Sequence, residues 1–194
     1  VINMFNNEIE YYIYKSVQED NILPLTSKCN LSCIFCSHKQ NPSDIEIISI
    51  GNLKKEKALE LSDYLDSNRP IIIGESATKI IEGEPLLYPH FQEIVKTIRE
   101  KYHDTEIKIT TNANLLDKEM LDFFDKIKNI SVNISVNYLN SNLRKKVMGK
   151  KCNPNILTTL ELINNYNLEY NFSMVALPHI IGYETIQKEI IEMM

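Results

Sequence analysis

Three of the four cysteines lie close together in the chain, in a pattern suited to a metal centre. They are Cys29, Cys33 and Cys36. Thiolates are soft ligands that select zinc, copper(I) or iron-sulfur clusters. His38 could complete a Cys3His zinc site, although zinc loops usually combine two ligand pairs and the second pair is absent. Structural zinc and a three-cysteine cluster with one open iron therefore both remain possible.

The fourth cysteine, Cys152, has no cysteine neighbours, so this chain alone cannot assemble a second cluster, and we expect a free or buried thiol. The other histidines show no ligand spacing, and we expect most of them at the surface. The short basic run formed by Arg144, Lys145 and Lys146 is typical of a solvated surface.

The composition is that of an ordinary globular chain of one domain. It has 194 residues, 43% apolar and 24% charged, and a net charge of -5. The negative charge disfavours a general nucleic-acid binder. No apolar run approaches the ~20 residues of a membrane span, and the chain does not start with a basic segment before an apolar one. We therefore expect a cytoplasmic protein that does not bind membranes.

Short β-branched runs alternate with segments of helical period, which predicts an α/β fold built from βα units around a mostly parallel sheet. The expected strands are residues 21–26, 78–82, 106–111, 130–136 and 170–177, and the expected helices are residues 54–65, 89–102, 118–127, 155–166 and 183–194. Pro89 is expected in the first turn of its helix. Residues 44–50 and 71–73 could pair as an inserted hairpin. Residues 1–20 form an N-terminal extension on the edge of a core that covers residues 21–194.

Polar residues follow the expected strands at the points where those strands end. The cysteines follow the first strand, Gly83-Glu84-Pro85 the second, Thr110-Thr111-Asn112 the third and Ser135-Val136-Asn137 the fourth. In parallel βα folds, ligands bind at the carboxyl ends of the strands. We therefore expect these groups to meet in one site.

The cysteine spacing C-x-x-x-C-x-x-C after the first strand, with Phe35 before the last cysteine, resembles the radical S-adenosylmethionine (radical SAM) superfamily. The G-E-P at residues 83–85 and the T-T-N at residues 110–112 agree with it in order and position. The resemblance covers residue 21 to the end of the chain. It implies a partial parallel (β/α) barrel, in which five βα units can be recognised here.

The resemblance also implies two cofactors, a [4Fe-4S] cluster and S-adenosylmethionine. Cys29, Cys33 and Cys36 would ligate three irons, and the fourth iron would bind the amino and carboxylate groups of S-adenosylmethionine. Reductive cleavage would give a deoxyadenosyl radical that abstracts hydrogen from a substrate. The protein supplies position and excludes water. Phe35 would meet the adenine.

The resemblance implies that Glu84 would accept a hydrogen bond from the cofactor's ammonium group. Gly83 would allow close backbone approach, and Pro85 would fix the turn that aims the carboxylate. The alternative for Glu84 is a surface carboxylate that caps the helix at Pro89. The family usually has two glycines before this glutamate, whereas this chain has Glu82-Gly83. The sequence therefore leaves the geometry of the turn before Glu84 undetermined.

The resemblance places further cofactor contacts at the ends of the third and fourth strands. Asn112, Ser135 and Asn137 would contact the ribose hydroxyls and the methionyl carboxylate. Each could instead cap a loop, since Asn and Ser are common turn formers. Arg144 would aim its guanidinium at the cofactor carboxylate, or form a solvated ion pair.

The sequence does not identify the substrate, because peptide modification, synthesis from nucleotide-derived small molecules and activation of a partner enzyme all use the same cofactor core. An electron donor such as flavodoxin or ferredoxin is implied. The alternative function is a zinc or iron-sulfur protein that uses the loop structurally and binds a partner.

The sixth strand of such a barrel is missing from the recognisable pattern. We therefore expect an open edge at residues 170–177, in a chain that is either truncated or completed by a macromolecular substrate or a second subunit.

Overall fold

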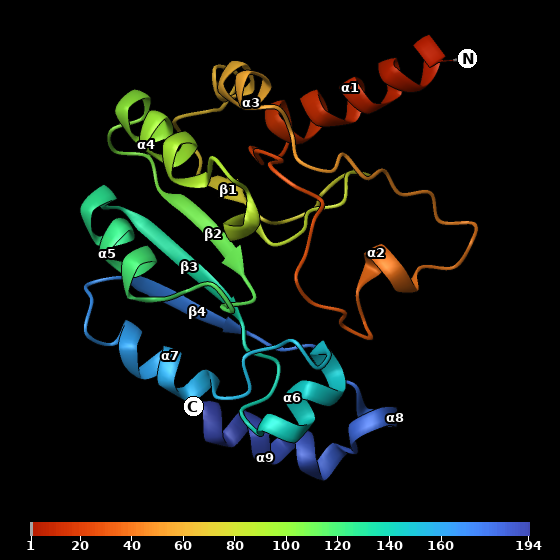
Figure 1. Cartoon of the computed structure of the whole chain (residues 1–194), viewed down its shortest axis with the longest axis vertical. Helices are drawn as coiled ribbons and strands as arrows, with labels where there is room; N and C mark the ends of the chain where they lie inside the picture. The colour runs from red at the N-terminus through yellow and green to blue at the C-terminus, as the bar shows by residue number, and fades with distance from the viewer. Residues whose placement is uncertain (1) are drawn as a thin grey trace.

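A parallel sheet lies at the centre of the computed structural model, which describes residues 2–194, with side chains from residue 8 onward. Its strand order is β1-β2-β3-β4 (Figure 1). The strands are β1 (Ile71–Ile73), β2 (Ile107–Thr111), β3 (Ile130–Ser135) and β4 (Glu169–Ser173). Because all three pairings are parallel, the carboxyl ends of the strands lie at one edge of the sheet.

Helices α4 (Phe91–Lys101) and α5 (Lys118–Ile127) lie on one side of the sheet, and the cysteine loop with α2 (Ser37–Gln40) lies on the other (Figure 1). The remaining helical elements are α1 (Ile2–Gln18), α3 (Lys55–Ser62), the 3-10 turn η1 (Pro85–Leu87), α6 (Ser141–Met148), α7 (Ile156–Ile163), α8 (Pro178–Ile181) and α9 (Tyr183–Met193). Among the described residues, no helix combines the length and apolar character that a membrane crossing requires.

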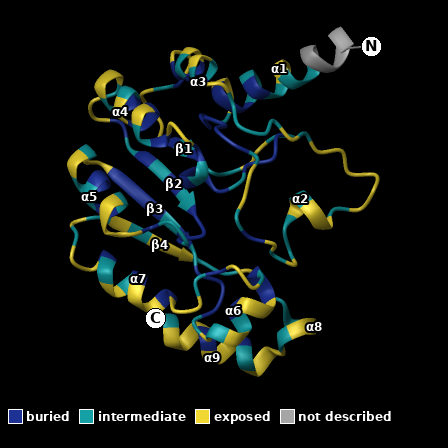
Figure 2. Cartoon of the chain, viewed as in Figure 1, coloured by how far each residue is buried: buried dark blue, intermediate teal, exposed yellow. Residues whose placement is uncertain are grey.

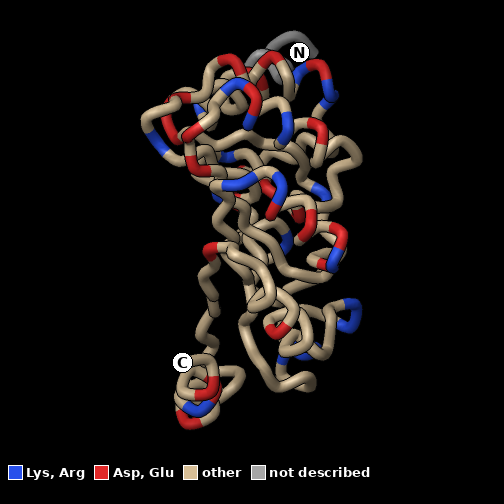
Figure 3. The backbone as a smooth tube through the Cα atoms, turned by 90° about the vertical axis from the view of Figure 1, so that its left-hand side faces the viewer, with Lys and Arg blue, Asp and Glu red and all other residues tan. Residues whose placement is uncertain are grey.

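The main core fills the space between the sheet and the helices on its covered face. Ile94 and Ile98 of α4 and Phe124 of α5 are buried in one cluster with Ile109 of β2. Burying each such side chain contributes about 1.5–3 kcal/mol. The buried faces of these helices turn toward the sheet (Figure 2). Acidic and basic residues are interspersed over the upper part of the backbone (Figure 3).

The helix predictions are confirmed for five segments, with ends that differ by a few residues. Residues 118–127 form α5 as expected, and Asp117 caps it by accepting from the Met120 N–H at 3.0 Å. Pro89 does not open its helix, because α4 begins at Phe91 after the separate turn η1. Helices α1 and α6 were not predicted. In α6 the buried set includes a charged residue, so the sequence shows no clear apolar face there.

Two strand predictions are wrong. Residues 21–26 make only two isolated bridges, a parallel one between Ile22 and Ile72 and an antiparallel one between Thr26 and Asn52, and Pro24 between them has no N–H to donate. Residues 78–82 form no strand, and the strand that pairs with β2 is instead β1 at Ile71–Ile73. The hairpin of residues 44–50 with 71–73 is also wrong, because Ile48 bridges Ile80 instead.

Strand β4 is the last strand of the sheet, and Glu169, Asn171 and Phe172 on it are exposed. An edge strand offers backbone groups to only one neighbour, so its amides exchange more readily with solvent. We expect the amides of residues 169–173 to exchange at least ~10-fold faster than those of residues 107–111 in β2. Hydrogen exchange on the monomer measures this, and equal protection of the two strands would contradict an open edge.

Candidate active site

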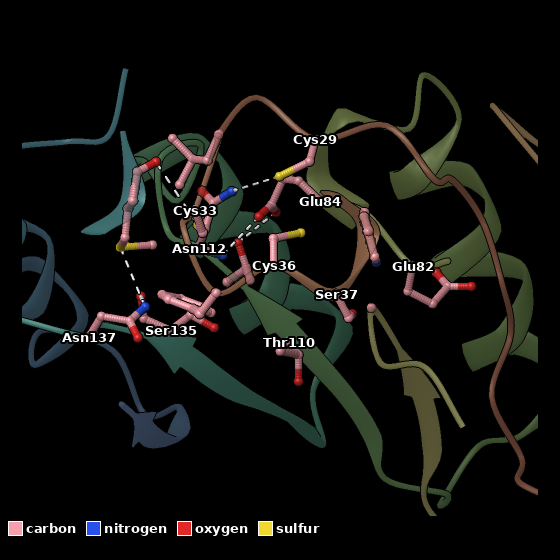
Figure 4. Close-up of a pocket in the computed structure, with 17 residues that line it drawn as sticks. Cys29, Cys33, Cys36, Ser37, Glu82, Glu84, Thr110, Asn112, Ser135 and Asn137 are labelled. Atoms are coloured by element: carbon pink, nitrogen blue, oxygen red, sulfur yellow. Dashed lines mark hydrogen bonds between the residues drawn. The ribbon is translucent and has the colours of Figure 1, made fainter. Parts of the chain in front are cut away.

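One cavity of about 260 Å³ opens at the carboxyl edge of the sheet (Figure 4). It brings together every site residue selected from the sequence except Arg144. Those lining it are Cys29, Cys33, Phe35, Cys36, Gly83, Glu84, Asn112, Ser135 and Asn137. These side chains come from the cysteine loop and from the segments that follow β1, β2 and β3.

The cysteine loop is held in place by backbone contacts with the end of α6. The N–H of Ser32 donates to the Met148 carbonyl at 3.2 Å, and that of Ile34 donates to the Val147 carbonyl at 2.9 Å. Leu31 and Phe35 pack in an apolar cluster with Met148. The loop therefore presents its sulfurs from a rigid and largely apolar wall, which limits solvent access to a bound metal.

The three thiols lie close enough to influence one another. Burial, together with the neighbouring sulfurs of Cys29 and Cys36, raises the pKa of Cys33 to about 12. Burial also raises the pKa of Cys29. A metal centre that binds these groups as thiolates must supply positive charge and displace their protons.

The cavity can be compared with both metal alternatives through its donors. Cys29, Cys33, Cys36 and His38 all line it. A [4Fe-4S] cluster places its three cysteine ligands on three different irons, which three thiolates on one short loop can supply. The donor set therefore fits a cluster.

The Gly83-Glu84 segment pairs with the chain just before the first cysteine. The N–H of Gly83 donates to the Thr26 carbonyl at 2.7 Å, and that of Glu84 donates to the Lys28 carbonyl at 2.8 Å. A Cβ on Gly83 would lie 2.0 Å from the Lys28 carbonyl oxygen, closer than any real contact. Only glycine fits here, and the close approach expected of Gly83 is made to the protein's own backbone.

The Glu84 carboxylate is buried and is already bound by the protein. It accepts from the Thr111 hydroxyl at 2.6 Å and from the backbone N–H of Asn112 at 2.8 Å. A third bond from the Leu86 N–H, at 3.3 Å, caps η1. Burial raises the pKa of Glu84, and these three bonds oppose the rise. The carboxylate thus fastens the end of β2 to the turn after Gly83.

Asn112 and Asn137 line the cavity and also stabilise loops. The Asn112 amide donates to the Asn30 side chain at 2.8 Å and lies 3.8 Å from the Cys29 sulfur. The Asn137 side-chain oxygen Oδ1 accepts from the Val175 N–H at 3.0 Å, and the Asn137 backbone has a φ of 58°. Asn tolerates this left-handed conformation better than most residues. Ser135, at the end of β3, is half-buried in the same wall.

Arg144 does not line the cavity, and its side chain is fully buried. The guanidinium donates to the carbonyl oxygens of Asn153 at 2.9 Å and Asn112 at 3.1 Å, and also to that of Val136. It is therefore not part of a surface basic run, and no ion pair in the described residues involves it. Arg144 joins the loops after β2 and β3 beneath the cavity.

Several lining residues were not singled out from the sequence as part of the site. Thr110 and Thr111 lie at the end of β2, where the T-T-N pattern already indicated them. Gly74 follows β1 directly. Met148 had no signal, because α6 was not predicted. Glu82 was noted only as a departure from the family. It is 8% exposed, its Oε1 has no hydrogen-bond partner among the described residues, and burial raises its pKa well above the usual range.

Glu82→Gln should change how stability depends on pH. Because the folded-state pKa is raised, the native protein keeps this proton at a pH where the unfolded chain has lost it. The wild type therefore loses stability as pH rises above the usual glutamate pKa, and the glutamine variant lacks this loss. We expect the variant to gain on the wild type between pH 5 and pH 8 in urea unfolding of the cluster-free proteins. Parallel pH profiles would contradict a buried, protonated Glu82.

Comparison with known proteins identifies the family. A family model described as the radical SAM superfamily matches residues 23–193. The chain belongs to this superfamily. Its fold is the partial parallel barrel of this superfamily, whose characteristic cofactors are a [4Fe-4S] cluster and S-adenosylmethionine.

Two curated relatives carry names of nucleotide chemistry. GTP 3',8-cyclase of Campylobacter jejuni subsp. doylei is 27% identical over 190 residues, which cover 96% of this chain and 53% of the relative. S-adenosylmethionine-dependent nucleotide dehydratase of Flammeovirga pacifica is 30% identical over 148 residues, which cover 72% and 47% of the two chains. The chain spans about half the length of the curated relatives it matches.

A solved structure agrees with the fold. Native anSMEcpe with bound AdoMet superposes with a TM-score of 0.62 at 19% identity, covering 89% of this radical SAM chain and 48% of its own. At this identity, the likeness supports the partial barrel and not a shared substrate.

Proposed function

We propose that this radical SAM chain binds its [4Fe-4S] cluster through Cys29, Cys33 and Cys36 and acts on a nucleotide. The observation that carries the proposal is the convergence of the three cysteines with the residues after β1, β2 and β3 on one cavity. The nucleotide is favoured because GTP 3',8-cyclase and a nucleotide dehydratase match this chain in sequence.

When bound at the three cysteines, the cluster together with S-adenosylmethionine would supply radical chemistry that removes a hydrogen atom from the substrate. The chain's own residues hold and shield these groups. Leu31, Phe35 and Met148 line the cavity with apolar surface that excludes water from the reaction. Phe35 faces the adenine in this proposal. The electron comes from a carrier such as flavodoxin or ferredoxin.

Asn112, Ser135 and Asn137 supply the polar contacts to S-adenosylmethionine in this proposal, and Gly83 lines the same cavity while it packs against the Lys28 backbone. Glu84 acts as a positioning residue, because its carboxylate holds the backbone of Asn112. The bonds that its oxygens accept from the protein favour this role over a direct ion pair with the cofactor's ammonium. Arg144 holds the same loop from below through the Asn112 carbonyl.

Glu84→Gln should keep the cluster and weaken the binding of S-adenosylmethionine. An amide NH2 at this place would face an N–H or O–H donor, so one buried bond becomes unsatisfied at a cost of about 1–3 kcal/mol. Part of that cost falls on the position of Asn112, and we expect roughly 5- to 50-fold weaker binding. Calorimetry on the cluster-loaded variant measures it. Unchanged affinity with unchanged iron content would remove Glu84 from the site.

The substrate class is tested by isotope transfer. The reduced, cluster-loaded enzyme is incubated with S-adenosylmethionine and each of the four ribonucleoside triphosphates, deuterated on the ribose. Transfer of deuterium to deoxyadenosine from one of them is the expected result. Deoxyadenosine without deuterium from any nucleotide would refute the nucleotide substrate and leave cofactor cleavage intact.

A further inference from the structure

Three polar side chains form a row across the uncovered face of the sheet. Thr110 on β2 is in register with Asn133 on β3, and Asn133 is in register with Asn171 on β4. Side chains in register on parallel strands point to the same face. Thr110 lines the cavity that holds the cysteines, so this face is the one opposite α4 and α5 (Figures 1 and 4). The row therefore extends from the cofactor cavity along the barrel interior.

Hydrogen bonds orient this row. The Thr110 hydroxyl donates to the Glu75 carboxylate at 2.7 Å, and the Asn133 amide N–H donates to the Thr110 hydroxyl oxygen at 3.4 Å. The chain of bonds from Asn133 to Glu75 turns the amide nitrogen of Asn133 toward β2. Its carbonyl oxygen then remains available to accept. Asn133 is half-buried and Asn171 is exposed, so both can meet a ligand in the barrel.

The interior of a closed βα barrel is normally packed with branched apolar side chains. Here the interior positions of β2, β3 and β4 carry hydroxyl, amide and charged groups instead. Such groups gain nothing from packing, but they pair well with hydroxyl and N–H groups of a ligand. The adjoining charges are mostly negative, since Glu75, Glu106 and Glu169 stand around Lys108 on this side of the sheet. A phosphate group is disfavoured beside them, whereas donor groups are favoured.

We propose that Thr110, Asn133 and Asn171 bind the nucleoside part of the substrate, through sugar hydroxyls or the edge of the base, and leave the phosphates outside the row. This inference rests on the proposed nucleotide substrate and adds the part of it that the barrel interior recognises. Thr110, at one end of the row, lines the cofactor cavity, so a sugar or base bound along the row lies next to that cavity.

Equilibrium binding to the cluster-loaded protein tests the row, with S-adenosylmethionine present and no reductant. The probes are the four ribonucleosides, their triphosphates and inorganic triphosphate. Asn133→Ala and Asn171→Ala should each weaken the binding of the preferred nucleoside about 3- to 10-fold, the effect of one lost hydrogen bond. Asn142→Ala, at an exposed asparagine of α6, is the matched control and should leave binding unchanged. Asn171 is exposed, so its variant should unfold like the wild type.

The outcomes separate this inference from the function on which it rests. If a nucleotide binds the wild type but both row variants bind it equally well, the row is not the nucleoside site and the nucleotide substrate survives. The same holds if inorganic triphosphate competes as strongly as the triphosphates. If no nucleoside or nucleotide binds the wild type, the nucleotide substrate itself is refuted. The assignment of the row as a nucleoside site is then refuted as well.

Discussion

Gly83→Ala should destabilise the protein by about 3 kcal/mol or more, above the usual cost of overpacking a well-packed site. The added Cβ would lie 2.0 Å from the Lys28 carbonyl oxygen and 2.5 Å from the Lys28 carbonyl carbon. Both are backbone atoms, which cannot rotate away as a side chain can. The strain falls on the segment that leads into Cys29, so cluster loading should fall as well.

Urea unfolding of the variant measures this effect, and Gly51→Ala is the matched control. Gly51 has a φ of 63°, and nothing lies within 4 Å of a Cβ placed there. The control therefore carries only the backbone strain of a left-handed alanine, about 1–2 kcal/mol. Equal losses in the two variants would mean that the pairing of Gly83 with Lys28 is looser than the structure shows.

Cys33→Ala should abolish stable cluster binding, with iron and sulfide content at least ~10-fold below the wild type. Cys33 is the middle ligand, and two remaining thiolates cannot hold three irons. Its sulfur is backed by the Met148 carbonyl, and the other cysteine packed in that apolar cluster, Cys152, does not line the cavity. Iron analysis and visible absorption after anaerobic reconstitution measure the effect.

Cys152→Ala is the control for this experiment. The Cys152 thiol is buried in the apolar cluster with Leu31 and Tyr138 and does not line the cavity. We expect this variant to load iron like the wild type. A Cys33→Ala protein with wild-type iron content, or a Cys152→Ala protein without iron, would contradict the ligand set.

The site could be predicted from the sequence because its chemistry lies at strand ends. Asn112 follows β2 directly, and the three close cysteines and the Gly83-Glu84 pair follow segments that bridge to neighbouring chain only at single residues, yet all of these groups reach one edge of the sheet. This prediction did not depend on accurate strand bounds. The expected strand at residues 78–82 is absent, yet Gly83 and Glu84 still reach the cavity because they pair with Thr26 and Lys28.

What sequence reasoning missed depends on contacts between distant segments. Residues 71–73 form β1, but they were not predicted as the second strand. Residues 78–82, in the loop between β1 and the G-E-P turn, matched the strand pattern instead. The burial of Arg144 was not predicted, because only the fold brings together the carbonyl groups that accept from it, those of Asn112, Ser135, Val136 and Asn153. Helix α6 was not predicted because its buried side includes Arg144, so its sequence lacks the periodic apolar pattern of a buried helix face.

Metal content and cofactor cleavage together give the most direct test. The protein is reconstituted anaerobically with iron and sulfide in the presence of zinc, then reduced with S-adenosylmethionine present. We expect a brown protein that holds iron and sulfide on Cys29, Cys33 and Cys36 and releases deoxyadenosine and methionine on reduction. A colourless protein that holds one zinc per chain and leaves S-adenosylmethionine intact would contradict the assignment of this cavity to the cluster.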